Sequence, residues 1–94
     1  MFGTIGHAHV KPENREALER VLQGQEIGPD SGFVQGYLLW PDGKDEVYLV
    51  AVFGDRDSYY RNANDPAQHQ RYLEYRALMD DEPTWVDGEI TAAQ

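Results

Sequence analysis

The stretch Glu46-Val47-Tyr48-Leu49-Val50-Ala51-Val52-Phe53-Gly54 decides the fold of this chain. Its β-branched and aromatic residues favour a strand, and apolar side chains fall on both alternating faces. Such a strand lies in the middle of a sheet that is covered on both sides. Helices are expected on one face of that sheet, and something else must cover the other face.

Three further strands are predicted around this stretch. The residues Pro41 to Asp45 form a strong turn signal, which predicts a hairpin with the strand before it. The final strand should bury Trp85 and Ile90. The three predicted strands cover Phe2 to Val10, Phe33 to Trp40 and Thr84 to Ile90.

Helices are predicted after the first strand and after the third strand. The first runs from Pro12 to about Gln25, with buried positions at helical spacing. A short helix, capped by Asp57 or Ser58, ends near Asn64. The main helix then runs from Pro66 to about Met79, with Asp65 as its cap.

The resulting order is βαββααβ, which predicts an α+β, ferredoxin-like fold with a four-stranded antiparallel sheet and helices on one face. The 94 residues, 1–94, are expected to form one domain, and the sequence has no internal repeat. The open sheet face predicts a partner, and a ligand cavity is expected beside the sheet.

Composition excludes several classes of function. The net charge is −9, and eight basic residues are scattered among 17 acidic ones, so neither nucleic acid nor a membrane is expected as a partner. There is no cysteine, which excludes disulfides and thiolate catalysis. No apolar run approaches the roughly 20 residues of a membrane helix, and the start carries no leader-like pattern, so a cytoplasmic protein is expected.

Several local patterns resemble those of the antibiotic biosynthesis monooxygenase family, within the dimeric α+β barrel group. They are Val10 to Glu13, Ser31 to Tyr37, Val52 to Ser58 and Asn64 to His69. Ser31 stands where the family usually has proline, and Phe53 where it commonly has tryptophan. The resemblance spans nearly the whole chain, but most of these patterns are structural.

The resemblance implies a homodimer whose sheets face each other, and a pocket between each sheet and its helices. It also implies activity of a cofactor-independent monooxygenase on an aromatic molecule that is quinol-like or polyketide-like. Since family members differ in chemistry, the fold locates a site without naming a reaction. A non-catalytic dimer that binds a small ligand, or a stress-associated protein, is the alternative, so whether the chain is an enzyme is left open.

Candidate catalytic residues are His69, Asn62 and His7. A histidine is the natural general base at neutral pH, and His69 lies in the first turn of the last helix. Asn62 can hydrogen-bond a carbonyl or a developing oxyanion, and His7 would help to shape the pocket. The predicted substrate-binding residues are Tyr37, Tyr72, Trp40 and His9.

His7 and His9 point to the same face of the first strand, a spacing that can hold a metal ion. Further ligands would have to come from Glu46, Asp87, Glu89 or His69, and the sequence places none of them nearby. The metal-free interpretation is therefore preferred. No cofactor is predicted: nucleotide-binding motifs are absent, and the last helix lacks the inner histidine that haem binding would need.

Overall fold

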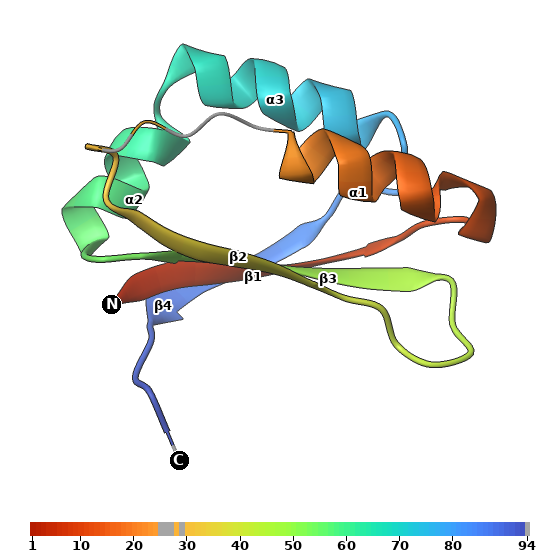
Figure 1. Ribbon diagram of the computed structural model, residues 1–94, viewed down its shortest axis with the longest axis horizontal. Coiled ribbons are helices and arrows are strands. Elements are labelled where there is room, and N and C mark those ends of the chain that lie inside the picture. Colours follow the sequence, from red (N-terminus) through yellow and green to blue (C-terminus); the bar gives the residue numbers. More distant parts are fainter. Residues whose placement is uncertain (25–27, 29, 94) are drawn as a thin grey trace.

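The computed structural model describes residues 1–24, 28 and 30–93, and its elements follow the predicted βαββααβ order (Figure 1). The elements are β1 (Phe2–His9), the 3-10 turn η1 (Pro12–Asn14), α1 (Arg15–Gln23), β2 (Phe33–Leu39), β3 (Glu46–Phe53), α2 (Arg56–Ala63), α3 (Pro66–Arg76) and β4 (Thr84–Glu89).

The four strands form one antiparallel sheet in the order β2-β3-β1-β4. Figure 1 shows the helices on one side of this sheet only. The predicted ferredoxin-like fold is confirmed, including the central place of the strand that begins at Glu46. Within the described part of the chain, no helix is both long and apolar enough to cross a membrane.

The hydrophobic core lies between the sheet and the helices. Its fully buried side chains come from both layers, with Val47 on β3 and Leu18 on α1 each at 0% exposure. The core cluster comprises Ala8, Val10, Leu18, Val47, Leu49, Tyr75 and Met79. Even-numbered residues of β1 are buried against the helices, while the odd-numbered Ile5, His7 and His9 face away.

Helix ends differ from the prediction in two places. Asp55, rather than Asp57 or Ser58, caps α2, because the Ser58 backbone N–H donates to Asp55 Oδ1 at 2.7 Å. The main helix ends at Arg76 instead of Met79, and the Arg76 side chain closes the turn by donating to the Met79 carbonyl at 3.1 Å. The predicted end of the first helix at Gln25 lies outside the described residues.

The prediction that Trp85 is a core residue is wrong, because its side chain is 40% exposed. The indole lies over Gly6 of the neighbouring strand, because a Cβ atom at that position would clash with the indole ring. Gly6 therefore provides the space in which Trp85 lies flat against the sheet. Asp65, by contrast, caps α3 as predicted, accepting the Ala67 N–H at 2.9 Å.

Candidate active site

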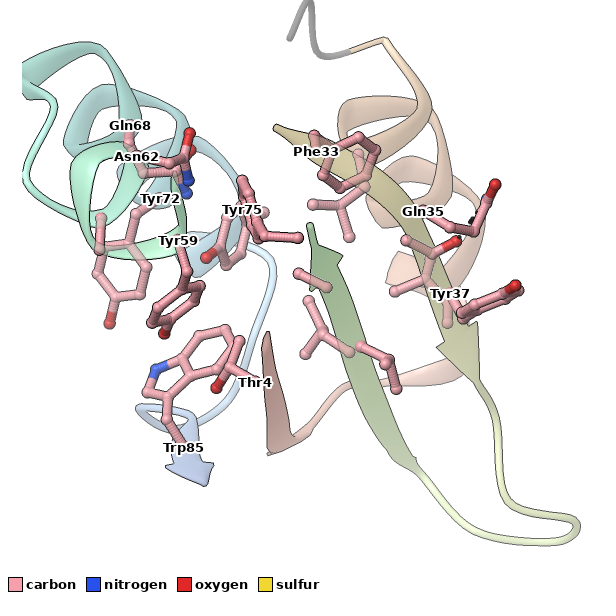
Figure 2. A pocket seen from close by; sticks show the side chains of 18 of the residues that line it. Thr4, Phe33, Gln35, Tyr37, Tyr59, Asn62, Gln68, Tyr72, Tyr75 and Trp85 are labelled. Atoms are coloured by element: carbon pink, nitrogen blue, oxygen red, sulfur yellow. Dashed lines mark hydrogen bonds between the residues drawn. The ribbon is translucent and has the colours of Figure 1, made fainter. Parts of the chain in front are cut away.

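A cavity of about 980 Å³ lies between the sheet and the helical layer (Figure 2). This volume is at the upper end of the range that suits a drug-sized ligand, roughly 300–1,000 Å³. All four strands and all three α-helices contribute to its wall. The side chains that the argument uses are Thr4, Phe33, Tyr37, Trp40, Phe53, Tyr59, Asn62, Gln68, His69, Tyr72, Tyr75, Trp85 and Asp87.

Aromatic rings form much of this wall and meet edge to face. The rings of Tyr72 and Tyr75 on α3 have centroids 5.4 Å apart at an interplanar angle of 84°. Phe53 on β3 meets Tyr59 on α2 at 5.6 Å and 72°. Edge-to-face pairs fix each other's ring planes, so the wall offers a preformed surface for a flat, apolar ligand.

Two tyrosine hydroxyls supply donors that stay protonated at neutral pH. Tyr59 donates to Asp87 Oδ1 at 2.9 Å, and burial together with this bond raises the pKa of Tyr59 to about 12. Burial, reinforced by the neighbouring Tyr72, also raises the pKa of Tyr75 to about 12. Both phenols therefore stay protonated near neutral pH and cannot accept a proton from a ligand, and Tyr59 already donates its own proton to Asp87.

Two side-chain amides stand where α2 passes into α3. Figure 2 shows Asn62 and Gln68 close together, on the same side of the cavity as Tyr72. The Gln68 Oε1 atom accepts a bond from Arg71 Nε at 3.0 Å, which leaves its NH₂ group to face other partners. This corner of the cavity can therefore donate hydrogen bonds to a ligand carbonyl.

His69 lies in the first turn of α3 and lines the cavity, although its side chain is exposed. The Asp65 cap and Pro66 fix the start of the helix, and the imidazole is stacked near Tyr72, with centroids 6.3 Å apart at 25°. His69 thus stands at the rim, in contact with both cavity and solvent.

The structure brings five of the predicted site residues to one cavity: His69, Asn62, Tyr37, Tyr72 and Trp40. Tyr37 lies at the outer margin and is 60% exposed. Trp40 is partly buried beneath Arg15, whose Cζ atom stands 4.7 Å from the ring centroid.

His7 and His9 are not among the residues that line the cavity. They alternate with Gly6 and Ala8, which face the helices, and so they lie on the opposite face of the sheet. Their separation from the cavity follows from the two-residue period of a strand.

Sequence reasoning missed Tyr59, Tyr75, Trp85, Asp87 and Gln68 as lining residues. A usable signal existed for two of them: Trp85 and Asp87 share a face of the last strand, opposite Val86. Tyr75 was recognisable only as a member of an apolar helical band. Residues that pack in a core and residues that line a cavity recur at the same helical spacing, so the sequence does not separate them.

No family model matches this chain, and no curated protein matches it significantly. Several solved structures, by contrast, match it over nearly its full length. A monooxygenase encoded by ActVA-Orf6 of Streptomyces coelicolor, in complex with nanaomycin D, has a TM-score of 0.80 at 18% identity, covering 99% of this chain and 89% of that one. SnoaB from Streptomyces nogalater, a cofactor-independent oxygenase whose structure carries an asparagine-to-alanine substitution, has a TM-score of 0.66 at 27% identity and covers 99% and 93%.

A third structure, a proposed antibiotic biosynthesis monooxygenase from Nitrosomonas europaea, has a TM-score of 0.73 at 15% identity, with coverage of 98% and 100%. The agreement extends over essentially the full length of each chain, and it matches the strand order and the one-sided helical layer described above. This chain therefore has the fold of the antibiotic biosynthesis monooxygenase family.

Proposed function

We propose that this protein is a cofactor-independent monooxygenase that acts on an electron-rich aromatic molecule of the quinol or polyketide type. The observation that carries the proposal is the aromatic cavity of about 980 Å³, with donor groups at one corner and a histidine at its rim. The similarity to SnoaB, a cofactor-independent oxygenase, supports the same reaction class.

His69 is proposed as the general base. Tyr59 and Tyr75 hold their protons too tightly, since the pKa of each is raised to about 12. Imidazole is the side chain best suited to accept a proton near neutrality. Its place at the rim allows the proton to pass on to water.

The reaction needs no added reductant when the substrate itself supplies the electrons. Removal of a proton from an anthrone-type CH₂ group leaves a carbanion that reduces O₂ and bonds to one of its oxygen atoms. The resulting peroxide loses water, so CH₂ becomes C=O, one oxygen atom enters the product and the other leaves as H₂O. The chain's task is to hold the ring, take the proton and stabilise the negative oxygen.

Asn62 is proposed to stabilise that oxygen. Preorganised donors of this kind contribute roughly 3–4 kcal/mol to catalysis in other enzymes. Tyr72 and Trp40 would bind the ring system from the inner wall. Tyr37 pairs with Val50 and so projects from the same open face as Ile5, and it would contribute only at the outer margin of the cavity. His7 and His9 take no part in this proposal, because neither lines the cavity.

The test is oxygen uptake by the purified, metal-free protein with a panel of anthrones and hydroquinones. His69→Gln and Asn62→Ala should each lower kcat by at least about tenfold, in line with the contribution of a general base or an oxyanion donor. Gln70→Ala is the matched control, since Gln70 is exposed on the same helix and does not line the cavity. Uptake that persists unchanged in both site variants would refute the assignment.

A second candidate function is ligand binding without turnover, and the exposure of His69 favours it. Solvent that reaches the imidazole would also reach a carbanion formed beside it, and protonation by water competes with the reaction with O₂. Under this alternative the same aromatic panel binds, as quenching of tryptophan fluorescence would reveal, but no oxygen is consumed by the wild-type protein.

We also propose that a second copy of the chain covers the open sheet face. Four large apolar side chains on the described part of this face are strongly exposed: Ile5 at 48%, Tyr37 at 60%, Leu39 at 55% and Val86 at 71%. A face this apolar, on a chain whose sequence patterns resemble the dimeric α+β barrel group, favours a homodimer.

A further inference from the structure

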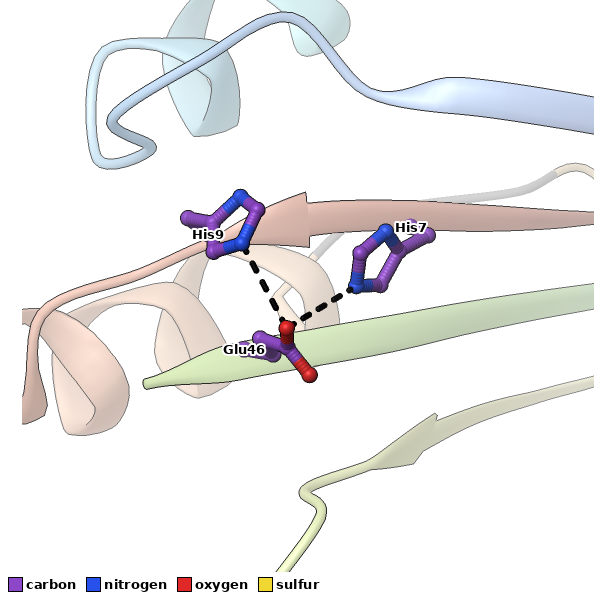
Figure 3. Close-up of side chains that lie close together, drawn as sticks. All are labelled: His7, His9 and Glu46. Atoms are coloured by element: carbon purple, nitrogen blue, oxygen red, sulfur yellow. Dashed lines mark ion pairs between the residues drawn. The ribbon is translucent and has the colours of Figure 1, made fainter. Parts of the chain in front are cut away.

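A group of titratable side chains lies close together on the open face of the sheet (Figure 3), and its histidines do not line the cavity. His7 and His9 occupy alternate positions of β1, so both imidazoles project from the same face. Glu46, the first residue of β3, stands directly opposite His9 in the register of the two strands. The sheet thus gathers two imidazoles and one carboxylate from positions far apart in the sequence.

The spacing of the three donors fits a single metal ion. The Glu46 Oε1 atom stands 3.4 Å from His9 Nε2 and 3.7 Å from His7 Nε2. One donor atom from each residue can be chosen so that all three lie within 4.8 Å of one another. Ligands at 2.0–2.1 Å from a tetrahedral zinc ion are separated by about 3.3–3.4 Å, so only small side-chain adjustments are needed.

His9 is already oriented as a metal ligand would be. Its Nδ1 atom lies 2.7 Å from Asp81 Oδ2, and its backbone N–H donates to Asp81 Oδ1 at 2.9 Å. An ionised carboxylate only accepts hydrogen bonds, so this contact places the proton of a neutral imidazole on Nδ1. The lone pair is then on Nε2, which faces Glu46; a carboxylate behind a histidine is the usual second partner of a metal-binding imidazole.

His7 supplies an independent observation. Its Nε2 atom is buried and has no hydrogen-bond partner among the described residues, although it faces Glu46. The ring is held by Tyr48, with centroids 4.6 Å apart at 32°. A buried polar atom without a partner is costly and calls for an explanation. A metal ion between His7, His9 and Glu46 would satisfy it.

We propose that His7, His9 and Glu46 form a binding site for a divalent first-row transition-metal ion of the Zn²⁺ type. Two imidazoles select such ions over Mg²⁺ and Ca²⁺, which prefer oxygen ligands. Three protein ligands leave a fourth position for water, as in open zinc sites. Asp81 acts from behind His9 as a positioning residue. The inference does not depend on the proposed oxygenase activity.

The test uses the full chain without an affinity tag, treated with chelator and titrated with Co²⁺ as a spectroscopic substitute for Zn²⁺. We expect one Co²⁺ per chain, visible d–d absorption of a low-coordinate ion, displacement by Zn²⁺, and persistence in excess Mg²⁺. Absence of d–d absorption, or binding that Mg²⁺ abolishes, would overturn the proposal.

Variants identify the ligands. His9→Gln and Glu46→Gln should each weaken binding by more than about tenfold, and Asp81→Asn by roughly tenfold, as expected for a partner behind a ligand. His69→Gln is the matched control: it removes the third histidine of the chain, which lies in the cavity, and should leave Co²⁺ affinity unchanged. If His69→Gln loses as much Co²⁺ affinity as the ligand variants do, the ion binds to histidines adventitiously and the proposed site is wrong.

A measurement on the wild-type chain tests the site even if the variants do not fold. Zinc should shift the imidazole ¹⁵N resonances of His7 and His9 and leave those of His69 in place. Shifts confined to His69, shifts spread equally over all three histidines, or no shift would each overturn the site.

Discussion

The two faces of one sheet carry different chemistry in this molecule. The face beneath the helices carries Thr4, Leu49 and Trp85, and it forms the floor of a cavity walled by tyrosines. The open face carries exposed aliphatic side chains and the His7–His9–Glu46 group. Strand β1 contributes to both, because its side chains alternate.

This contrast teaches that residues adjacent in the sequence need not serve the same site. His7 and Ala8 are neighbours, yet one contacts Glu46 on the open face while the other is buried in the core at 1% exposure. Each of the following predictions tests whether the two faces are as different as the structure indicates.

The largest effect is expected from Leu49→Ala, on the helix-facing side of β3. Leu49 is 7% exposed and belongs to the core cluster. Truncation of a buried leucine costs about 2–5 kcal/mol of unfolding free energy, through lost burial and the cavity left behind. Urea unfolding would measure this. Leu73→Ala, at an exposed leucine of α3, should stay within about 0.5 kcal/mol, and similar losses in both variants would contradict the core assignment.

Gly6→Ala should act next, by changing the floor of the cavity. The new methyl group would clash with the Trp85 ring. Either the indole moves, or the free energy of unfolding falls by about 1–3 kcal/mol. The emission of Trp85 should change together with ligand affinity. The matched control is Gly88→Ala on β4, where an added Cβ meets nothing within 4 Å. An unaltered fluorescence spectrum in Gly6→Ala would refute the contact.

Val86→Asp tests the open face. A carboxylate at this exposed position, 71% accessible in the single chain, would become buried in a homodimer at a large cost. We expect the dimer dissociation constant to rise by at least about tenfold, a change of roughly 1.4 kcal/mol. Analytical ultracentrifugation would measure it, with Leu73→Asp on the helical layer as control. A wild-type chain that sediments as a monomer would overturn the proposed dimer.

The smallest effect concerns pH. Burial raises the pKa of Tyr75 to about 12, so the folded state favours the protonated phenol more than the unfolded state does. This contribution to stability is fully present below about pH 10 and is lost as the pH rises from 10 toward 12. Tyr75→Phe should therefore flatten the fall in the urea midpoint over that range. Tyr37→Phe, at an exposed ring, is the comparison, and identical slopes in wild type and Tyr75→Phe would contradict the prediction.

The order of elements and the sheet topology were predictable because the periodic signals are strong. The run from Val47 to Phe53 is apolar on both faces, which only a central strand explains. Asp65 followed by Pro66 marked the start of α3 without ambiguity. The cap of α2 was harder, since Asp55, Asp57 and Ser58 are all good capping residues and only backbone geometry chooses among them.

The candidate site was less predictable than the fold. Five of seven site residues line one cavity, but the sequence gives no sign of which face of a sheet the helices cover. The pattern therefore predicts His7 and His9 at the pocket, whereas the structure places them across the sheet. It also predicts Trp85 in the core, because a core residue and a residue that lines a cavity have the same sequence pattern. Only the structure shows that Gly6 lies opposite the ring.

The alternation of β1 also limits how this protein can evolve. Point substitutions at His7 or His9 leave the cavity floor intact, and substitutions at Thr4 leave the imidazoles intact, so the two faces can diversify independently. Insertion or deletion of one residue within Phe2–His9 would instead exchange the two faces for the shifted part of the strand. The imidazoles would turn toward the helices, and buried side chains such as Ala8 would turn to the open face. We expect natural variation in this strand to proceed by replacement alone.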